Sequence, residues 1–187
     1  MILSVLQIIE DDQLRMAVER LFDMYHKQMM AKANGILHNW HDAEDAVQDT
    51  FYRVSRNIED FLPVESQSAK ALLMIYTRNA AINMYNRKKK QNELFYSKKD
   101  ISELVLPGDD PDDDVLELMI NEETVEILRQ GIAQLDEMHR DVIMLKYYYN
   151  KKNLEIADIM CVDVNVINAR VFRAKKKLLA YMKGVGV

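Results

Sequence analysis

Two basic segments hold the residues of this 187-residue chain that are best suited to bind another molecule. Arg87, Lys88, Lys89 and Lys90 are four consecutive bases within "NRKKKQ", and residues 163–183 carry six bases against one acid. Clustered Lys and Arg side chains bind phosphates and make nucleic-acid affinity depend on salt. A basic helix end can also simply complement the helix dipole, but four adjacent bases exceed that need, so we favour phosphate contact.

Enzymatic or metal chemistry has weaker support. His41 and Asp45 lie one helical turn apart, as two metal ligands would. However, the sequence has no His-Glu-x-x-His motif and no glycine-rich phosphate loop, and it has one cysteine, Cys161. We expect Cys161, in apolar surroundings, to be buried rather than reactive. The sequence therefore predicts no catalytic centre, no cofactor and no metal.

The composition predicts that these residues are positioned almost entirely by helices. Five Gly and three Pro are too few for the turns of a sandwich, a barrel or repeated strand-helix units. Hydrophobic residues make up 49% of the chain and the net charge is −5, which favours a folded core over disorder. The first residues fit neither a signal peptide nor a membrane span, and the single cysteine fits a cytoplasmic location.

The uneven charge distribution predicts two domains. Residues 100–126 hold eleven acids and no base, so the remainder of the chain carries a net charge of +6. The motif "PGDDPDDD" within this segment disfavours a helix because it combines prolines, a glycine and like charges. We therefore predict two small helical domains, 1–98 and 126–187, joined by an acidic linker over 99–125. A surface loop within one domain is the alternative.

Hydrophobic periodicity predicts the main helices of the first domain. One helix has apolar residues recurring from Leu14 to Tyr25, a second begins near Asp42 as a possible cap, and a long third runs from about Ser68 into the basic run. The second helix turns a set of mainly apolar residues inward: Ala46, Val47, Thr50, Phe51 and Val54. Its opposite face is strongly acidic: Glu44, Asp45, Gln48 and Asp49.

The second domain has the spacing of a helix-turn-helix. Asp136 can cap a helix, a short helix covers Leu154 to Met160, and a last helix opens at Asp163. The last helix turns these residues inward: Val164, Ile167, Val171, Ala174 and Leu178. Its outward residues suit phosphates and base edges in a major groove: Asn165, Asn168, Ala169, Phe172, Arg173, Lys175 and Lys176.

The order of these parts resembles the extracytoplasmic-function sigma factors of bacterial RNA polymerase. Residues 15–92, with "DAEDAVQDTFYRV" and "IYTRNAAINMYNRKKK", are similar to the family's first domain. Residues 126–183, with the Leu-x-x-x-x-Arg pattern of "LDEMHR", are similar to its second domain. The resemblance implies a non-enzymatic factor that binds core RNA polymerase and promoter DNA, and that an anti-sigma factor often holds inactive.

The resemblance assigns roles to three groups of residues. The polymerase-binding group is Glu44, Asp45, Gln48 and Asp49, for which plain solvation of a helix face is the alternative. The promoter-melting group is Arg78, Asn79, Asn83, Arg87, Lys88, Lys89 and Lys90, with Tyr85 as a stacking surface and Tyr76 in the core. The promoter-reading group is Asn165 and Asn168 on base edges, with Arg170, Arg173, Lys175 and Lys176 on phosphates.

The chain departs from the family pattern at several positions. Asn83 and Asn86 replace a common acid and Arg, a common Trp near Leu72 is missing, and Cys161 replaces the Gly of the turn. The residues Val166, Asn168 and Ala169 stand where Thr, Lys and Ser are frequent. Two other functions stay open: a helix-turn-helix regulator whose residues 1–100 sense or dimerise, and an interaction protein without promoter function.

Overall fold

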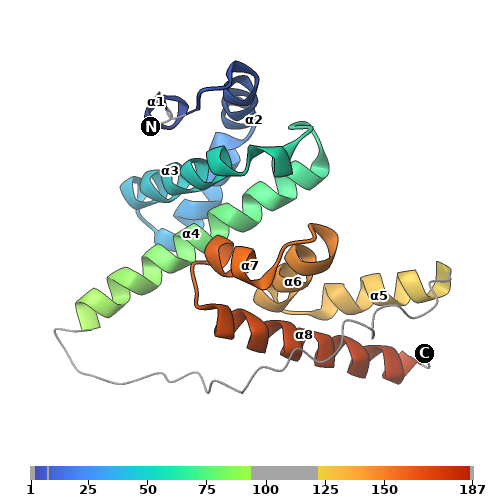
Figure 1. Cartoon of the computed structure of the whole chain (residues 1–187). Coiled ribbons are helices and arrows are strands. Elements are labelled where there is room, and N and C mark those ends of the chain that lie inside the picture. The colour runs from blue at the N-terminus through green and yellow to red at the C-terminus, as the bar shows by residue number, and fades with distance from the viewer. Residues whose placement is uncertain (1–2, 8, 94–121, 186–187) are drawn as a thin grey trace. The chain divides into compact units, whose positions relative to one another are not determined.

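The computed structural model describes residues 3–7, 9–93 and 122–185 (Figure 1). All regular secondary structure in these ranges is helical, which confirms the predicted all-α class. The described helices form two compact units, one before and one after the undescribed segment. The predicted linker lies outside the described residues from 99 to 121, and its last residues belong to a helix that begins at Glu122. None of the described helices combines the length and apolarity needed to cross a bilayer.

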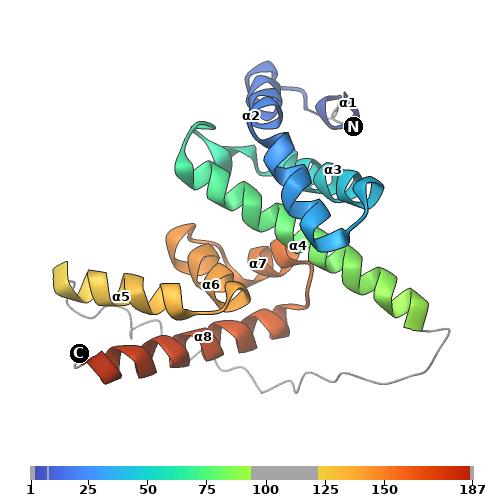
Figure 2. The same cartoon turned by 180° about the vertical axis from the view of Figure 1, so that it is seen from behind.

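The N-terminal unit is built from three long helices, α2 (Asp12–Leu37), α3 (Trp40–Arg56) and α4 (Gln67–Glu93), as Figures 1 and 2 show. A short α1 (Leu3–Leu6) precedes them, and the 3-10 helix η1 (Ile58–Phe61) lies between α3 and α4. The three long helices pack against one another around fully buried side chains: Leu21, Met29, Phe51, Leu72 and Leu73.

The start of α3 differs from the prediction. Asn39 is the N-cap, and its side-chain oxygen accepts a hydrogen bond of 3.1 Å from the amide of Asp42. Asp42 was predicted as a possible cap, but it lies in the first turn. Asn39 occupies the cap position, and its side chain satisfies the otherwise free amide of Asp42. The inward face is confirmed, since all five residues predicted to turn inward are buried.

The C-terminal unit contains α5 (Glu122–Gln134), α6 (Glu137–Ile143), a π-helical turn η3 (Met144–Tyr148), α7 (Asn153–Met160) and α8 (Val164–Val185). Asp136 caps α6 as predicted, by accepting from the amide of His139 at 3.1 Å. The helices α5 and α6 pack along α8 (Figure 2). A Cβ at Gly131 of α5 would lie 3.0 Å from the ring of Tyr181, so the glycine permits close approach of α5 and α8.

Candidate nucleic-acid interface

The outer face of α3 carries the predicted polymerase-binding residues. Asp45 is exposed, and Glu44, Gln48 and Asp49 are partly exposed. The opposite face is buried, and its one hydroxyl is satisfied because Thr50 donates to the carbonyl of Ala46 at 2.9 Å. The helix therefore separates an apolar packing face from an acidic face that is available to a partner.

Tyr52 is a member of this outer face that the sequence interpretation missed. Its side chain follows Asp45 by seven residues and Gln48 by four, which places all three on one side of the helix, and it is 45% exposed. Asp49 is partly neutralised by Arg53, whose Nε lies 3.0 Å from the carboxylate. The seven-residue spacing from Asp45 is the signal that identifies Tyr52 from sequence.

The structure divides the predicted promoter-melting residues of α4 into two groups. Arg78 and Asn79 are each 5% exposed, and the amide of Asn79 donates to the carbonyl of Ile75 at 2.8 Å. The sequence interpretation grouped these two residues with the basic run as contacts of the separated strand, whereas the structure buries both of them. The physical reason is the packing of the middle of α4, where every residue from Tyr76 to Ala81 is buried.

The exposed basic end of α4 begins after Asn83, which is half-buried. Every residue from Tyr85 to Lys90 is exposed, and the Tyr85 side chain is 48% exposed. Tyr76 instead lies in the core, with its ring 5.4 Å from that of Phe61 in an edge-on arrangement, as predicted. The basic end thus presents consecutive cations beside an accessible aromatic ring.

One residue of this basic end is tied to another helix. Lys88 forms an ion pair with Asp42 in the first turn of α3. The side chain of Asp42 is 13% exposed, whereas that of Lys88 is 49% exposed. The pair joins the buried side of α3 to the basic end of α4.

The last helix, α8, presents a line of exposed side chains opposite its buried stripe. The side chain of Asp163 accepts from the amide of Asn165 at 2.8 Å at the start of the helix. Asn165, Phe172 and Lys176 are exposed, while Ile167 and Val171 are buried. The spacing of seven and four residues places the three exposed side chains on one face, as the hydrophobic pattern predicts.

Two of the predicted promoter-reading residues make contacts inside the C-terminal unit. Asn168 accepts a hydrogen bond of 2.7 Å from the side chain of Asn153, which joins α8 to the start of α7. The ammonium of Lys175 lies 5.5 Å from the ring centroid of Tyr147. The sequence interpretation missed both supporting residues, because neither contact follows from helical spacing.

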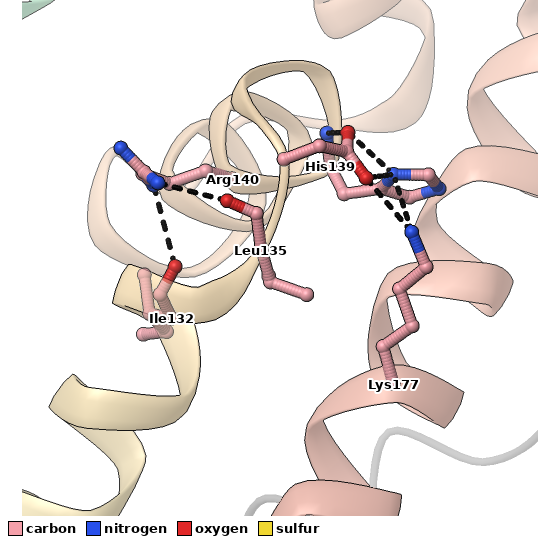
Figure 3. A network of polar contacts seen from close by, with 6 residues as sticks. Ile132, Leu135, His139, Arg140 and Lys177 are labelled. Atoms are coloured by element: carbon pink, nitrogen blue, oxygen red, sulfur yellow. Dashed lines mark hydrogen bonds and ion pairs between the residues drawn. The ribbon is translucent and has the colours of Figure 1, made fainter.

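Arg140 gives the Leu-x-x-x-x-Arg pattern a structural meaning, as Figure 3 shows. Its guanidinium donates to the carbonyls of Ile132 at 3.3 Å, Ala133 at 3.0 Å and Leu135 at 2.8 Å. These carbonyls lie at or just after the C-terminal end of α5, where a helix leaves acceptors without internal partners. Arg140 therefore joins α6 to the end of α5.

A second polar junction joins α6 to α8 (Figure 3). The ammonium of Lys177 lies 2.7 Å from the carboxylate of Asp136, and the Nδ1 of His139 lies 2.6 Å from the same group. The hydrogen bond from Lys177, together with those from His139, holds the pKa of Asp136 well below its usual range, against a smaller opposing effect of burial. Lys177 thus ties the middle of α8 to the start of α6.

The turn between α7 and α8 contains a left-handed residue. Cys161 has φ 55° and is half-buried, so it is less buried than predicted. Glycine adopts this conformation with little strain, whereas a residue with a Cβ is disfavoured there. The position thus explains why a glycine suits this turn. Among the described side chains, no group of three His, Cys, Asp or Glu residues is arranged to hold a metal ion.

In a comparison with known proteins, both units match described protein families. Residues 21–91 match the family description "Sigma-70 region 2", and residues 125–178 match "Sigma-70, region 4". The chain is 27% identical to the ECF RNA polymerase sigma factor SigW of Bacillus subtilis, over 84% of each protein. It is 25% identical to the RNA polymerase sigma factor YlaC of the same organism, over 88% of this chain and 91% of that protein.

Comparison with solved structures also finds a match. It is the co-crystal structure of the sigma factor RpoE in complex with the anti-sigma factor NepR from Bartonella quintana. The match covers 88% of this chain and 96% of that chain, with 15% sequence identity and a TM-score of 0.32.

Proposed function

Because the chain belongs to the extracytoplasmic-function sigma factors of the sigma-70 family, we propose how its two units divide the work of promoter recognition. The protein directs transcription initiation together with core RNA polymerase and promoter DNA. The observation that carries this function is the match to region 2 and then to region 4 in a single chain. A helix-turn-helix regulator that works without polymerase is not favoured, because it would not need the region 2 unit.

The outer face of α3 is the proposed docking surface for core polymerase. Asp45, Gln48 and Tyr52 lie on one side of the helix, flanked by Glu44 and Asp49. Acidic side chains steer association with a basic partner and set the register, and an exposed tyrosine adds contact area at low entropic cost. This combination supports a basic polymerase surface as the partner of α3.

The exposed end of α4 is the proposed contact with the separated promoter strand. Arg87, Lys89 and Lys90 offer cations for phosphates, and the ring of Tyr85 offers a surface for an unstacked base. Arg78 and Asn79 are left out of this proposal because they are buried.

The exposed line of α8 is the proposed reader of the upstream promoter element. Asn165 is suited to pair with adenine, and Phe172 is suited to contact a thymine methyl group. Arg173 and Lys176 lie beside them and are assigned to phosphates, as is Arg170, which is half-buried. Asn168 and Lys175 support the domain through Asn153 and Tyr147, so we assign them a smaller share of direct DNA contact.

The protein is proposed to perform no chemistry of its own. It supplies binding surfaces, while the polymerase catalyses RNA synthesis, and it needs no cofactor. Its proposed location is the cytoplasm, because bacterial core polymerase and promoter DNA are found there. An anti-sigma partner remains a prediction from the family resemblance.

Run-off transcription with purified bacterial core polymerase tests this function. We expect specific new start sites on genomic fragments of the source organism only when the protein is added. Asp45→Ala should weaken core binding, whereas Asp23→Ala, which removes an exposed acid from α2, should not. Lys176→Ala should lower promoter affinity and reduce the salt slope by about one.

The alternative function makes a different prediction in the same assay. A protein that gives no new starts but protects two symmetric half-sites about one helical turn apart without polymerase would be a regulator. That outcome would overturn the sigma-factor assignment.

A further inference from the structure

We propose that the ion pair between Asp42 and Lys88 positions the basic end of α4 relative to the docking helix α3. Lys88 then acts in promoter opening through Asp42 rather than by binding DNA itself. The inference rests on the proposed roles of α3 and α4, and it removes one cation from the predicted DNA-contact surface.

The environment of Asp42 carries the first step. Its side chain is 13% exposed and belongs to the buried side of α3, so it is withdrawn from the outer face that contains Asp45. A carboxylate that loses most of its water needs a charged partner, and Lys88, 46 positions away in the sequence, supplies it. The pair is therefore built into the packing of α3 against α4.

The exposure of α4 carries the second step. Tyr85 to Lys90 are all exposed, so this end of the helix lacks the apolar packing that holds its middle. Exposed helix ends fray readily, and an ion pair to a packed neighbour limits that motion. Lys88 thus supplies a restraint at the place where apolar burial has ended.

The geometry of a helix carries the third step. Successive residues are turned by about 100°, so when Lys88 faces α3, Lys90 faces almost the opposite way and Arg87 lies about a quarter turn aside. Lys90 is therefore directed away from α3 and Arg87 to one side of it, and both are exposed and available to DNA. Because Asp42 lies one turn before Asp45, polymerase that holds the outer face of α3 would also fix the direction of these two cations.

A double-mutant cycle tests the inference in the full-length protein. Asp42→Asn and Lys88→Gln should each slow promoter opening about fivefold, measured by permanganate reactivity of unpaired thymines with core polymerase. The double variant should be no slower than either single variant, and Lys88→Arg should retain opening. Core affinity should change less than twofold, because the outer face of α3 is unaltered.

Lys90→Gln is the matched control for direct DNA contact. It should slow opening and also make the salt dependence shallower, whereas Asp42→Asn should leave the salt slope unchanged. If Lys88→Gln slows opening while Asp42→Asn does not, Lys88 binds DNA directly and the inference is wrong. Equal losses of core affinity and of thermal stability in both variants would also overturn it, since the pair would then only maintain the fold.

Amide hydrogen exchange in the free protein gives a readout that needs no polymerase. Exchange over residues 85–90 should become faster in Asp42→Asn and in Lys88→Gln, and remain unchanged in Lys90→Gln. Unchanged exchange in the first two variants would overturn the inference. The proposed function is tested separately, by whether the unaltered protein initiates transcription at specific sites. A failure of the proposed function can therefore be distinguished from a failure of the ion-pair inference.

Discussion

The two units of the protein are stabilised internally by different kinds of contact. In the N-terminal unit, α2 and α4 are 26 and 27 residues long and pack around buried apolar side chains. In the C-terminal unit, α6 and α7 are only 7 and 8 residues long, too short to be stable alone. Arg140, the Asp136–Lys177 pair and the Asn153–Asn168 hydrogen bond join these short helices to their neighbours.

In the N-terminal unit, the residues proposed to bind partners differ from those that stabilise the fold. In the C-terminal unit, one helix does both. The proposed docking face of α3 and the basic end of α4 lie outside the apolar core of the N-terminal unit. In contrast, α8 carries the buried stripe, the Lys177 anchor and the proposed DNA-reading line on a single helix. Substitutions in α8 therefore need stability controls before a loss of DNA binding is interpreted.

The largest expected effect tests the apolar core of the N-terminal unit. Phe51→Ala should lower its free energy of unfolding by about 3–5 kcal/mol, because the ring is 1% exposed and contacts Phe22. Urea unfolding followed by the fluorescence of Trp40, the single tryptophan, measures this loss. The neighbouring Tyr52→Ala should change stability by less than about 0.5 kcal/mol, yet it should weaken binding to core RNA polymerase. Equal destabilisation by both variants would contradict the separation of surface and core.

The next effect tests the polar junction of the C-terminal unit. Arg140→Ala should destabilise that unit by about 2–3 kcal/mol, because the carbonyls at the end of α5 lose a charged donor. Amide exchange in α5 and α6 measures the loss, and the Trp40 transition should not move. Arg129→Ala is the control, since Arg129 pairs with Glu126 on the exposed side of α5. A similar loss from both variants would show that charge alone, rather than the junction, matters.

A smaller effect concerns the pH dependence of the same unit. The pKa of Asp136 is lowered in the folded protein, chiefly by Lys177, so its contribution to stability is present above the ordinary carboxyl pKa of about 3.9 and is lost as the pH falls below it. Lys177→Met should remove at most about 1 kcal/mol at pH 7 and flatten the acid dependence. Acid unfolding of the C-terminal unit checks this, with Lys176→Met as control. Parallel acid curves for the native protein and Lys177→Met would refute the assignment.

The smallest effect is a gain in stability. Cys161→Gly should stabilise the C-terminal unit by about 0.5–1 kcal/mol, because glycine relieves the left-handed strain at the cost of greater freedom in the unfolded chain. Thermal unfolding measures the gain, and Cys161→Ala, which keeps a Cβ, should not show it. A destabilised glycine variant would mean that contacts of the thiol outweigh the backbone strain.

Much of the site was predictable because it depends on short-range patterns. The acidic face of α3 and the exposed line of α8 follow from the spacing of apolar residues along each helix. The cap at Asp136 follows from a side chain and an amide three residues apart. Tyr52 was also within reach of this reasoning, because its spacing from Asp45 is a helical one.

Other features depend on which helices pack together. Helical spacing places Asp42 near the start of a helix, but only the packing of α3 against α4 gives it Lys88 as a partner. Likewise, Arg78 and Lys88 are both bases on α4, and only tertiary burial makes one interior and the other exposed.

The sequence by itself determined the helical class, the helix-turn-helix and the order of the acidic and basic faces. These features arise from interactions within a few residues, where helix geometry dictates which side chains share a face. The tertiary structure decided which charged residues are free to bind a partner and which hold the fold. That distinction depends on ion pairs and burial between segments far apart in the chain, such as Asp42 with Lys88 and Asp136 with Lys177.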